Sequence, residues 1–141
     1  MKYTNIGSIS SGTLRDEDLL EAFADALESE ARRQGCLKEH REMLRDARRE
    51  VLDDVGDLIN ELSDALNDLS PPYFYFGANE GDGSDFGWWF AGMENYDELA
   101  VRDLSEVPTG FTGEVMLVND HGNATLYRCV RGRLYEQWSI V

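Results

Sequence analysis

The order of hydrophobic and polar residues divides the chain into two parts at Pro71-Pro72. Before these prolines, apolar residues recur at helical spacing, which is typical of amphipathic helices. After them, aromatic and β-branched residues alternate with polar ones between glycine-containing turns, which is typical of strands. The pattern therefore predicts a single domain over residues 1–141, with a helical part over residues 1–70 and a mainly β part over residues 71–141.

A first helix is expected to begin after the sequence Ser10-Ser11-Gly12-Thr13 and to end near Gly35. Thr13 followed by Asp16 is a variant of the capping box, and further acids in the first turn complement the helix dipole. Two arginines before Gly35 supply the signals of a helix C-terminus. The apolar side of this helix is formed by Leu19, Leu20, Phe23, Ala24, Leu27 and Ala31.

A second helical stretch is predicted over residues 37–69. At about 100° per residue its leucines and valines stay on one side, which is compatible with one long helix. Gly56 falls on the polar side and leaves a bend or a break into two helices open. The apolar side would cover a sheet or join a second subunit equally well, so a homodimer also stays open. This side is formed by Leu37, Leu44, Val51, Val55, Leu58, Leu62, Leu66 and Leu69.

Five strands are predicted after the prolines. The last three are separated by residues 119–123 and by Arg131-Gly132, which are turn compositions, so they should form an antiparallel meander. A short helix around residues 95–104 is expected to connect the second strand to the third. The predicted class is α+β, with N-terminal acidic helices packed on a C-terminal antiparallel sheet of four to five strands. The predicted strands are residues 73–76, 86–90, 114–118, 125–130 and 134–140.

Net charge is the most unusual property of the chain, because 13 basic and 28 acidic residues give −15 at pH 7. A field of this sign repels nucleic acids and anionic membranes and attracts basic surfaces. The hydrophobic content of 42% nevertheless indicates a packed core. The chain lacks an apolar run of membrane-spanning length and an apolar segment near its start, so we expect a cytoplasmic protein. Cys36 and Cys129 are then expected to stay reduced.

Much of the negative charge falls on the polar side of the predicted second helix, which we call the acidic ridge. Its carboxylates recur at least once per turn, over about 44 Å if the helix is unbroken. The usual meaning of such a run is a solvated helix face. Alternatively, the ridge imitates the charge row of a nucleic-acid backbone and binds the arginines and lysines of a nucleic-acid-binding protein. The acidic ridge comprises Glu39, Glu42, Asp46, Glu50, Asp53, Asp57, Glu61, Asp64 and Asp68.

The segment FGANEGDGSDFGWWF, residues 76–90, combines glycines, acids and aromatic residues. Glu80, Asp82 and Asp85 resemble calcium ligands, but their spacing differs from that of a helix-loop-helix calcium site. We expect a hairpin whose glycines adopt positive φ and whose acids keep an aromatic edge soluble. An alternative function is an interaction module or adaptor that binds through this hairpin, with Trp88 or Trp89 as an exposed anchor. The negative charge would then serve solubility alone.

Catalytic and cofactor motifs are not recognisable in the sequence. Cys129 could lie across a hairpin from His121, but no third group orients the pair. A hydrolase using Asp82, Asp85 or Asp120 lacks a convergent set of groups for the same reason. Cys-x-x-Cys, His-Glu-x-x-His and Gly-x-x-x-x-Gly-Lys do not occur. We therefore expect a protein that is not an enzyme and holds no metal or cofactor.

Three segments carry a resemblance to a known group of proteins: ISSGTLRDEDLLEAFADAL, YFYFGANEGDGSDFGWWF and MLVNDHGNATLY. Together they resemble small acidic proteins of phages and mobile elements, a group without an established catalytic motif. Proteins of this kind resemble anti-defence proteins, among them anti-CRISPR and anti-restriction DNA mimics. The resemblance implies an inhibitor in the bacterial host cell whose partner is the basic, nucleic-acid-binding surface of a defence complex. It transfers no site residues.

Overall fold

The computed structural model describes residues 2–49 and 54–141, which group into two compact units. One unit comprises Asn5–Ala91 and contains the α-helices, so we call it the helical unit. The other comprises Met1–Thr4 and Gly92–Val141, and we call it the β unit. The predicted α+β class is confirmed, and its strands form one sheet of three and one of four strands. Pro71 and Pro72, where the composition changes, lie inside the helical unit.

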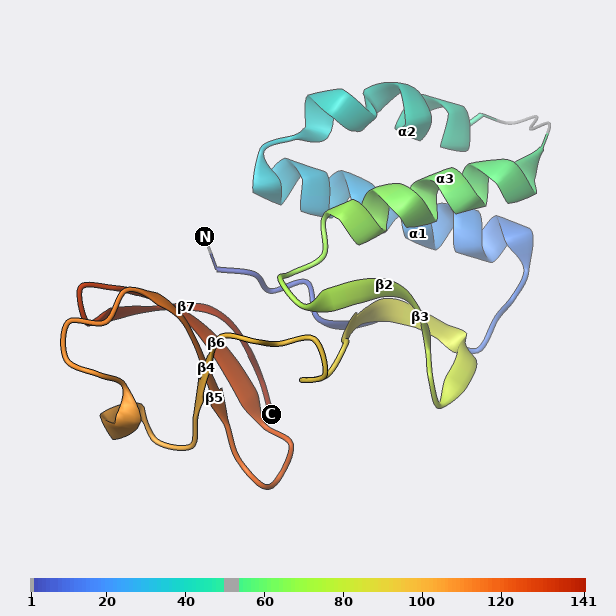
Figure 1. The fold of residues 1–141 in the computed structure, drawn as a ribbon. Coiled ribbons are helices and arrows are strands. Elements are labelled where there is room, and N and C mark those ends of the chain that lie inside the picture. Colours follow the sequence, from blue (N-terminus) through green and yellow to red (C-terminus); the bar gives the residue numbers. More distant parts are fainter. Residues whose placement is uncertain (1, 50–53) are drawn as a thin grey trace. The chain divides into compact units, whose positions relative to one another are not determined.

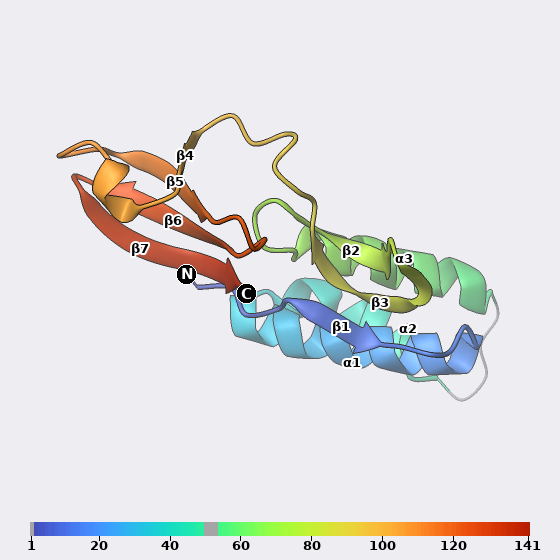
Figure 2. The same ribbon diagram turned by 90° about the horizontal axis from the view of Figure 1, so that it is seen from below.

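The helical unit is built in three layers (Figures 1 and 2). Its sheet has the order β1-β3-β2, and both outer strands run antiparallel to β3. Helices α1 and α3 cover one face of this sheet, and α2 lies on the other side of the helix pair. The elements in chain order are β1 (Gly7–Ser10), α1 (Asp16–Gln34), the 3-10 helix η1 (Leu37–His40), α2 (Arg41–Ala47), α3 (Val55–Asp68), β2 (Phe74–Asn79) and β3 (Asp82–Phe90).

Helix α1 begins and ends close to the predicted positions, but its start differs in chemistry. The capping box predicted for Thr13 and Asp16 is wrong, because the Thr13 hydroxyl instead donates a 2.7 Å hydrogen bond to the Asp18 carboxylate. The acids of the first turn still complement the positive end of the dipole. At the other end, Gly35 has φ 79°, and the N–H of Cys36 bonds to the carbonyl of Ala31 at 2.8 Å. This left-handed residue closes the helix as the sequence predicts.

Of the two alternatives left open for residues 37–69, the structure shows the break into separate helices and not one long helix. Helix α2 ends at Ala47, and α3 begins at Val55 after Asp54, which has φ 53°. Gly56 lies within α3 rather than at the break. Helix α3 runs back in the direction opposite to α2 (Figure 1). The leucine pattern hides this break, because both segments bury their leucines in one core: Leu44, Leu58, Leu62 and Leu66.

Aromatic side chains form the centre of the helical unit between helices and sheet. The ring of Phe23 on α1 lies edge-on to Phe76 at 5.2 Å and to Phe86 at 5.4 Å between centroids. Phe76 in turn contacts the Trp88 ring at 5.2 Å. Edge-to-face aromatic pairs of this kind add to the stabilisation from buried area. Trp88 is only 4% exposed, so this part of the glycine-rich segment belongs to the core.

The β2–β3 hairpin forms as predicted, but its glycines serve a different purpose. The expectation of positive φ there is wrong, because the positive-φ glycines of the described chain lie elsewhere. Gly87 instead allows β1 to approach: a Cβ at this position would lie 2.1 Å from the carbonyl oxygen of Gly7. In the turn, the side-chain oxygen of Asn79 accepts a 2.8 Å hydrogen bond from the N–H of Gly81. Gly87 thus allows the close packing of β1 on β3, and Asn79 stabilises the turn.

The β unit contains the predicted antiparallel meander plus one parallel strand. Its sheet has the order β4-β5-β6-β7, in which β4 pairs parallel to β5. The helix predicted around residues 95–104 is wrong, because Leu99, Ala100 and Val101 pair with β5 as a strand. The N–H of Tyr3 donates to the carbonyl of Gln137 at 2.6 Å, beside β7. The elements are β4 (Leu99–Val101), the 3-10 helix η2 (Leu104–Glu106), β5 (Gly113–Val118), β6 (Ala124–Val130) and β7 (Arg133–Ile140).

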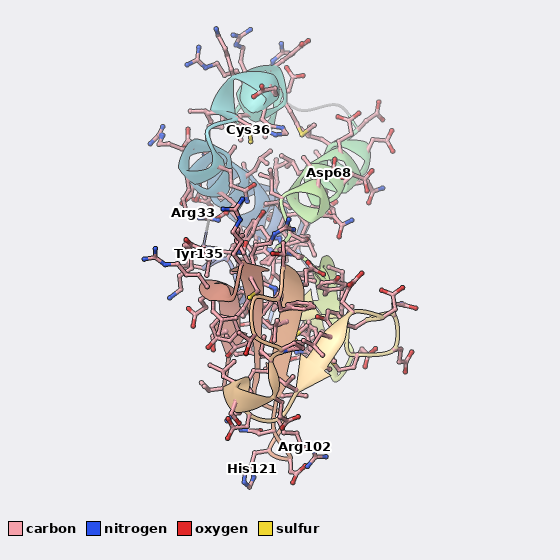
Figure 3. The ribbon with its side chains drawn as sticks, turned by 60° about the vertical axis from the view of Figure 1, so that its left-hand side comes forward. Arg33, Cys36, Asp68, Arg102, His121 and Tyr135 are labelled. Atoms are coloured by element: carbon pink, nitrogen blue, oxygen red, sulfur yellow. The ribbon has the colours of Figure 1, made fainter. Side chains whose placement is uncertain are left out.

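Both cysteines are free thiols. Cys129 is fully buried in β6, and its thiol donates to the carbonyl of Phe111 at 3.1 Å. Cys36 follows the end of α1 and is half-buried, at the turn towards α2 (Figure 3). Cys129 therefore acts as a small apolar residue with one satisfied donor.

Candidate functional site

Four carboxylates follow the outer side of α3, and we call them the carboxylate row. Asp57, Glu61, Asp64 and Asp68 are all exposed, at the spacing that places residues on one side of a helix. The opposite side of α3 is buried in the core. Asp68 lies at the C-terminal end of this helix (Figure 3). The leucine pattern of α3 therefore orients the row towards solvent.

Within the described residues, no ion pair reaches any carboxylate of the row, and α3 itself carries no basic residue. The acids of α1 and α2 are partly compensated instead. The Arg48 guanidinium lies 2.9 Å from the Asp25 carboxylate, and Arg49 lies 3.2 Å from Asp46. In the last turn of α3, the charge of Asp68 also opposes the helix dipole. The negative charge of α3 is therefore exposed to solvent, and no described residue pairs with it.

The acidic ridge predicted from the sequence does not form one continuous row, because the chain reverses between α2 and α3. Glu39 and Glu42 belong to η1 and α2, and Asp46 is half-buried and paired. Glu50 and Asp53 lie outside the described residues. Of the ridge residues predicted to contact a partner, the structure brings Asp57, Glu61, Asp64 and Asp68 together.

Two of the three acids predicted in the hairpin, Asp82 and Asp85, accept hydrogen bonds from nearby serines. Asp82 accepts hydrogen bonds from the N–H of Ser84 at 3.0 Å and from its hydroxyl at 2.8 Å. These two bonds, the backbone one first, hold the pKa of Asp82 below its usual range. The Asp85 carboxylate accepts from the hydroxyl of Ser8 on β1. Glu80 is exposed in the turn between β2 and β3. This turn lies at the end of the helical unit where α1 and α3 begin (Figure 1).

The two tryptophans of the hairpin are not exposed anchors. The indole N–H of Trp88 donates to the carbonyl of Leu66 at 3.0 Å inside the core. Trp89 is half-buried, and its N–H donates to the carbonyl of Gly77 at 2.9 Å. Trp88 therefore joins the sheet to α3, and Trp89 joins β3 to β2 within the sheet. Neither side chain is the exposed aromatic contact that the alternative function requires.

The candidate catalytic pair of the β unit does not form. His121 lies in the turn between β5 and β6, whereas Cys129 lies near the far end of β6, opposite Gly113. At the His121 end of this sheet, the Arg102 guanidinium lies 2.7 Å from the Asp120 carboxylate (Figure 3). Among the residues that the structure describes, no three or more His, Cys, Asp or Glu side chains gather where a metal ion could bind.

One charged feature was not predicted from the sequence. Arg32, Arg41, Arg45 and Arg48 line a common pocket of about 390 Å³ between α1 and α2. The last three follow at intervals of four and three residues, which marks one side of a helix. The sequence shows this spacing. Their convergence with Arg32 depends on how α2 packs against α1.

Comparison with known proteins gives no relative: no family model matches the chain, and no curated protein or solved structure matches it. In the described part of the chain, no helix is long and apolar enough to cross a membrane. The functional argument therefore rests on the surfaces described above.

Proposed function

We propose that this protein is a non-enzymatic inhibitor that occupies the nucleic-acid-binding surface of a bacterial defence complex, in the manner of an anti-CRISPR protein. The observation that carries the proposal is the carboxylate row of α3, which is exposed and unpaired on a helix without basic residues. The resemblance of the sequence to phage and mobile-element proteins supports the choice of partner. The row replaces the longer acidic ridge as the contact surface.

The dimensions of the row suit a short stretch of nucleic-acid backbone. From Asp57 to Asp68 the helix rises by about 16 Å, at roughly 1.5 Å per residue. One strand of duplex DNA carries about five phosphates over that length, at roughly 3.4 Å per charge. Four carboxylates on a rigid helix therefore offer a charge density of similar order. A protein that binds DNA through arginine and lysine side chains would meet them with the same residues.

Folding alone does not account for this arrangement. Asp57 and Glu61, like Asp64 and Asp68, are like-charged pairs four residues apart, and each pair costs about 0.2–0.5 kcal/mol. The core requires only the buried side of α3, whose leucines would pack equally well without these acids. Like-charged pairs that oppose folding, made by acids that contact nothing within the described chain, are expected where those acids bind a partner.

The net charge also defines what the protein would bind. At −15 it repels nucleic acid, so the proposed partner is a basic protein surface and the complex contains no direct contact with DNA or RNA through this row. Such an interface associates rapidly and weakens as salt rises.

The decisive experiment is an affinity pull-down from a bacterial lysate that contains defence complexes, eluted by a salt gradient. The full chain is compared with the triple variant Glu61→Lys, Asp64→Lys and Asp68→Lys. The matched control variant carries Glu94→Lys, Asp97→Lys and Glu98→Lys, which changes net charge equally at exposed positions of the β unit.

We expect the full chain and the control to retain a nucleic-acid-binding complex that duplex DNA displaces, and the α3 variant to lose it. Equal retention by the α3 variant would remove the row from the mechanism. Equal loss in both variants would show that total charge alone attracts the partner. Circular dichroism of each variant establishes that its helices are intact.

A further inference from the structure

A pocket of positive charge lies in the helical unit of this acidic protein. Arg32 of α1, Arg41 and Arg45 of α2, and Arg48 after α2 line a pocket of about 390 Å³. Four of the chain's 13 basic residues thus surround one cavity. The remaining lining residues are Glu28, Leu37 and Leu44.

Three of the four arginines have no partner among the residues that the structure describes. In the part of the chain that the structure describes, no ion pair and no side-chain hydrogen bond reaches Arg32, Arg41 or Arg45. Arg48 is compensated by the carboxylates of Asp25 at 2.9 Å and Glu28 at 3.6 Å. With 28 acidic residues available in the chain, partners for the other three are not scarce. All three instead line the same pocket, where an anion would pair with them.

Helix stability does not explain all of these arginines. Arg32 and Arg45 lie in the last turns of α1 and α2, where positive charge is favourable. Arg41 lies in the first turn of α2, where positive charge opposes the dipole, and it stands four residues before Arg45 as a like-charged pair. Both effects are unfavourable for folding. A bound anion would offset both.

We propose that this pocket binds a small phosphorylated molecule, whose phosphate is held by Arg32, Arg41 and Arg45. The planar guanidinium group donates two parallel hydrogen bonds to phosphate oxygens, which makes arginine well suited to this anion. Leu44 is buried and Leu37 half-buried in the wall of the pocket, and they would contact an apolar or aromatic part of the ligand. The pocket volume falls within the range of about 300–1,000 Å³ found for small-molecule sites.

The surrounding charge favours a small ligand over a polymer. A long polyanion would extend into the field of a chain with net charge −15, whereas a small dianion experiences mainly the nearest arginines. Glu28 is the one acid in the lining, and its carboxylate faces Arg48 rather than standing alone. The site lies between α1 and α2 and uses no residue of the carboxylate row, so it stands apart from the proposed inhibitor function.

The test is an NMR titration of the full chain with AMP, with inorganic phosphate and with adenosine. We expect AMP and phosphate to shift the side-chain N–H signals of Arg32, Arg41 and Arg45, and adenosine to leave them in place. AMP should bind more tightly than inorganic phosphate, because its base adds contacts with the leucines.

Variants identify the site. The double variant Arg41→Gln and Arg45→Gln should weaken AMP binding about tenfold or more, because it removes charge-assisted hydrogen bonds. The matched control, Arg128→Gln and Arg133→Gln, removes the same charge from exposed positions of the β unit and should bind AMP unchanged. All four arginines of these two variants are exposed, and Arg41 and Arg45 have no side-chain partner within the described residues. Both variants should therefore fold, which circular dichroism checks.

Four results would overturn the proposal. The first is a titration without shifts at the three arginines, and the second is equal binding of adenosine and AMP. The third is unchanged AMP binding by the Arg41→Gln and Arg45→Gln variant. The fourth is tighter binding of succinate or of a single-stranded oligonucleotide than of AMP, which would assign the pocket to carboxylates or to a polymer. None of these results depends on the inhibitor function.

Discussion

The indole N–H of Trp88 donates a 3.0 Å hydrogen bond to the main-chain carbonyl of Leu66, and this contact joins the glycine-rich hairpin to the acidic helix. Leu66 is fully buried, and it lies within one helical turn of Asp64 and Asp68 along α3. The hairpin therefore supports the helix whose outer side carries the carboxylate row.

Replacing Trp88 with Phe should lower the free energy of unfolding by about 2 kcal/mol, because it removes a buried hydrogen bond and leaves a cavity. Trp89→Phe, at a half-buried position, should cost about 1 kcal/mol or less. Urea denaturation followed by the helical circular dichroism signal measures both. An equal loss for the two variants would contradict the core role assigned to Trp88.

Replacing Gly87 with Ala should destabilise the helical unit by about 1–3 kcal/mol or more, because the new Cβ would meet the carbonyl oxygen of Gly7. Gly83→Ala in the same strand has no neighbour within 4 Å and should change stability by about 0.5 kcal/mol or less. Thermal unfolding of the pair checks the prediction. A neutral Gly87→Ala variant would show that β1 does not pack closely on β3.

Replacing Asp68 with Lys should stabilise the chain by about 0.3–1 kcal/mol at low salt, since a cation in the last turn complements the dipole of α3. Asp57→Lys places the same charge in the first turn and should destabilise by a similar amount. Chemical denaturation at low and high salt compares the two. Effects of the same sign would mean that the dipole does not determine the outcome.

The free energy of unfolding of the β unit should fall at alkaline pH, because Tyr96 then loses its proton. Burial, reinforced by the charges of Glu114, Glu98 and Asp97, raises the pKa of Tyr96 to about 12. The folded state therefore holds this proton more tightly than the unfolded state. Its stabilising effect is complete below about pH 10 and is lost as pH rises towards about 12.

The ultraviolet absorbance of tyrosinate measures this ionisation directly. The difference between the full chain and Tyr96→Phe should titrate near pH 12. Tyr96→Phe should also lessen the alkaline loss of stability, although it gives up the 2.9 Å hydrogen bond to the carbonyl of Leu99. Tyr135→Phe changes an exposed tyrosine and should leave that loss unaltered. A difference spectrum that titrates near pH 10 would place Tyr96 in solvent.

The elements that the sequence predicted well are those whose signals are local. Gly35 ends α1 through its own backbone conformation, and the meander of β5, β6 and β7 is set by turns between neighbouring strands. The alternation of buried and exposed positions within each strand then needs no distant information.

The elements that the sequence missed depend on distant partners. Strand β1 is four residues long and pairs with β3, which lies about 80 residues later in the sequence. Gly87 of β3 leaves the space that β1 needs for this pairing. Strand β4 was mistaken for a helix because its three residues acquire their structure only by pairing with β5. The break after α2 was hidden because leucines before and after it serve the same core.

The candidate site was predicted only in part for the same reasons. Exposure of Asp57, Glu61, Asp64 and Asp68 follows from the leucine period within α3, which the sequence shows. The burial of Trp88 and the meeting of Arg32 with α2 depend on packing between separate elements, which no local pattern contains.

The hydrogen bond from Tyr3 to Gln137 has a consequence for the order in which the chain folds. All of the helical unit lies between these two residues in the sequence. A ribosome therefore completes the helical unit before the strand that receives Tyr3 exists, and that unit can fold around its own core first. The N-terminal residues remain unpaired until β7 has been made, so their docking follows the synthesis of the whole helical unit.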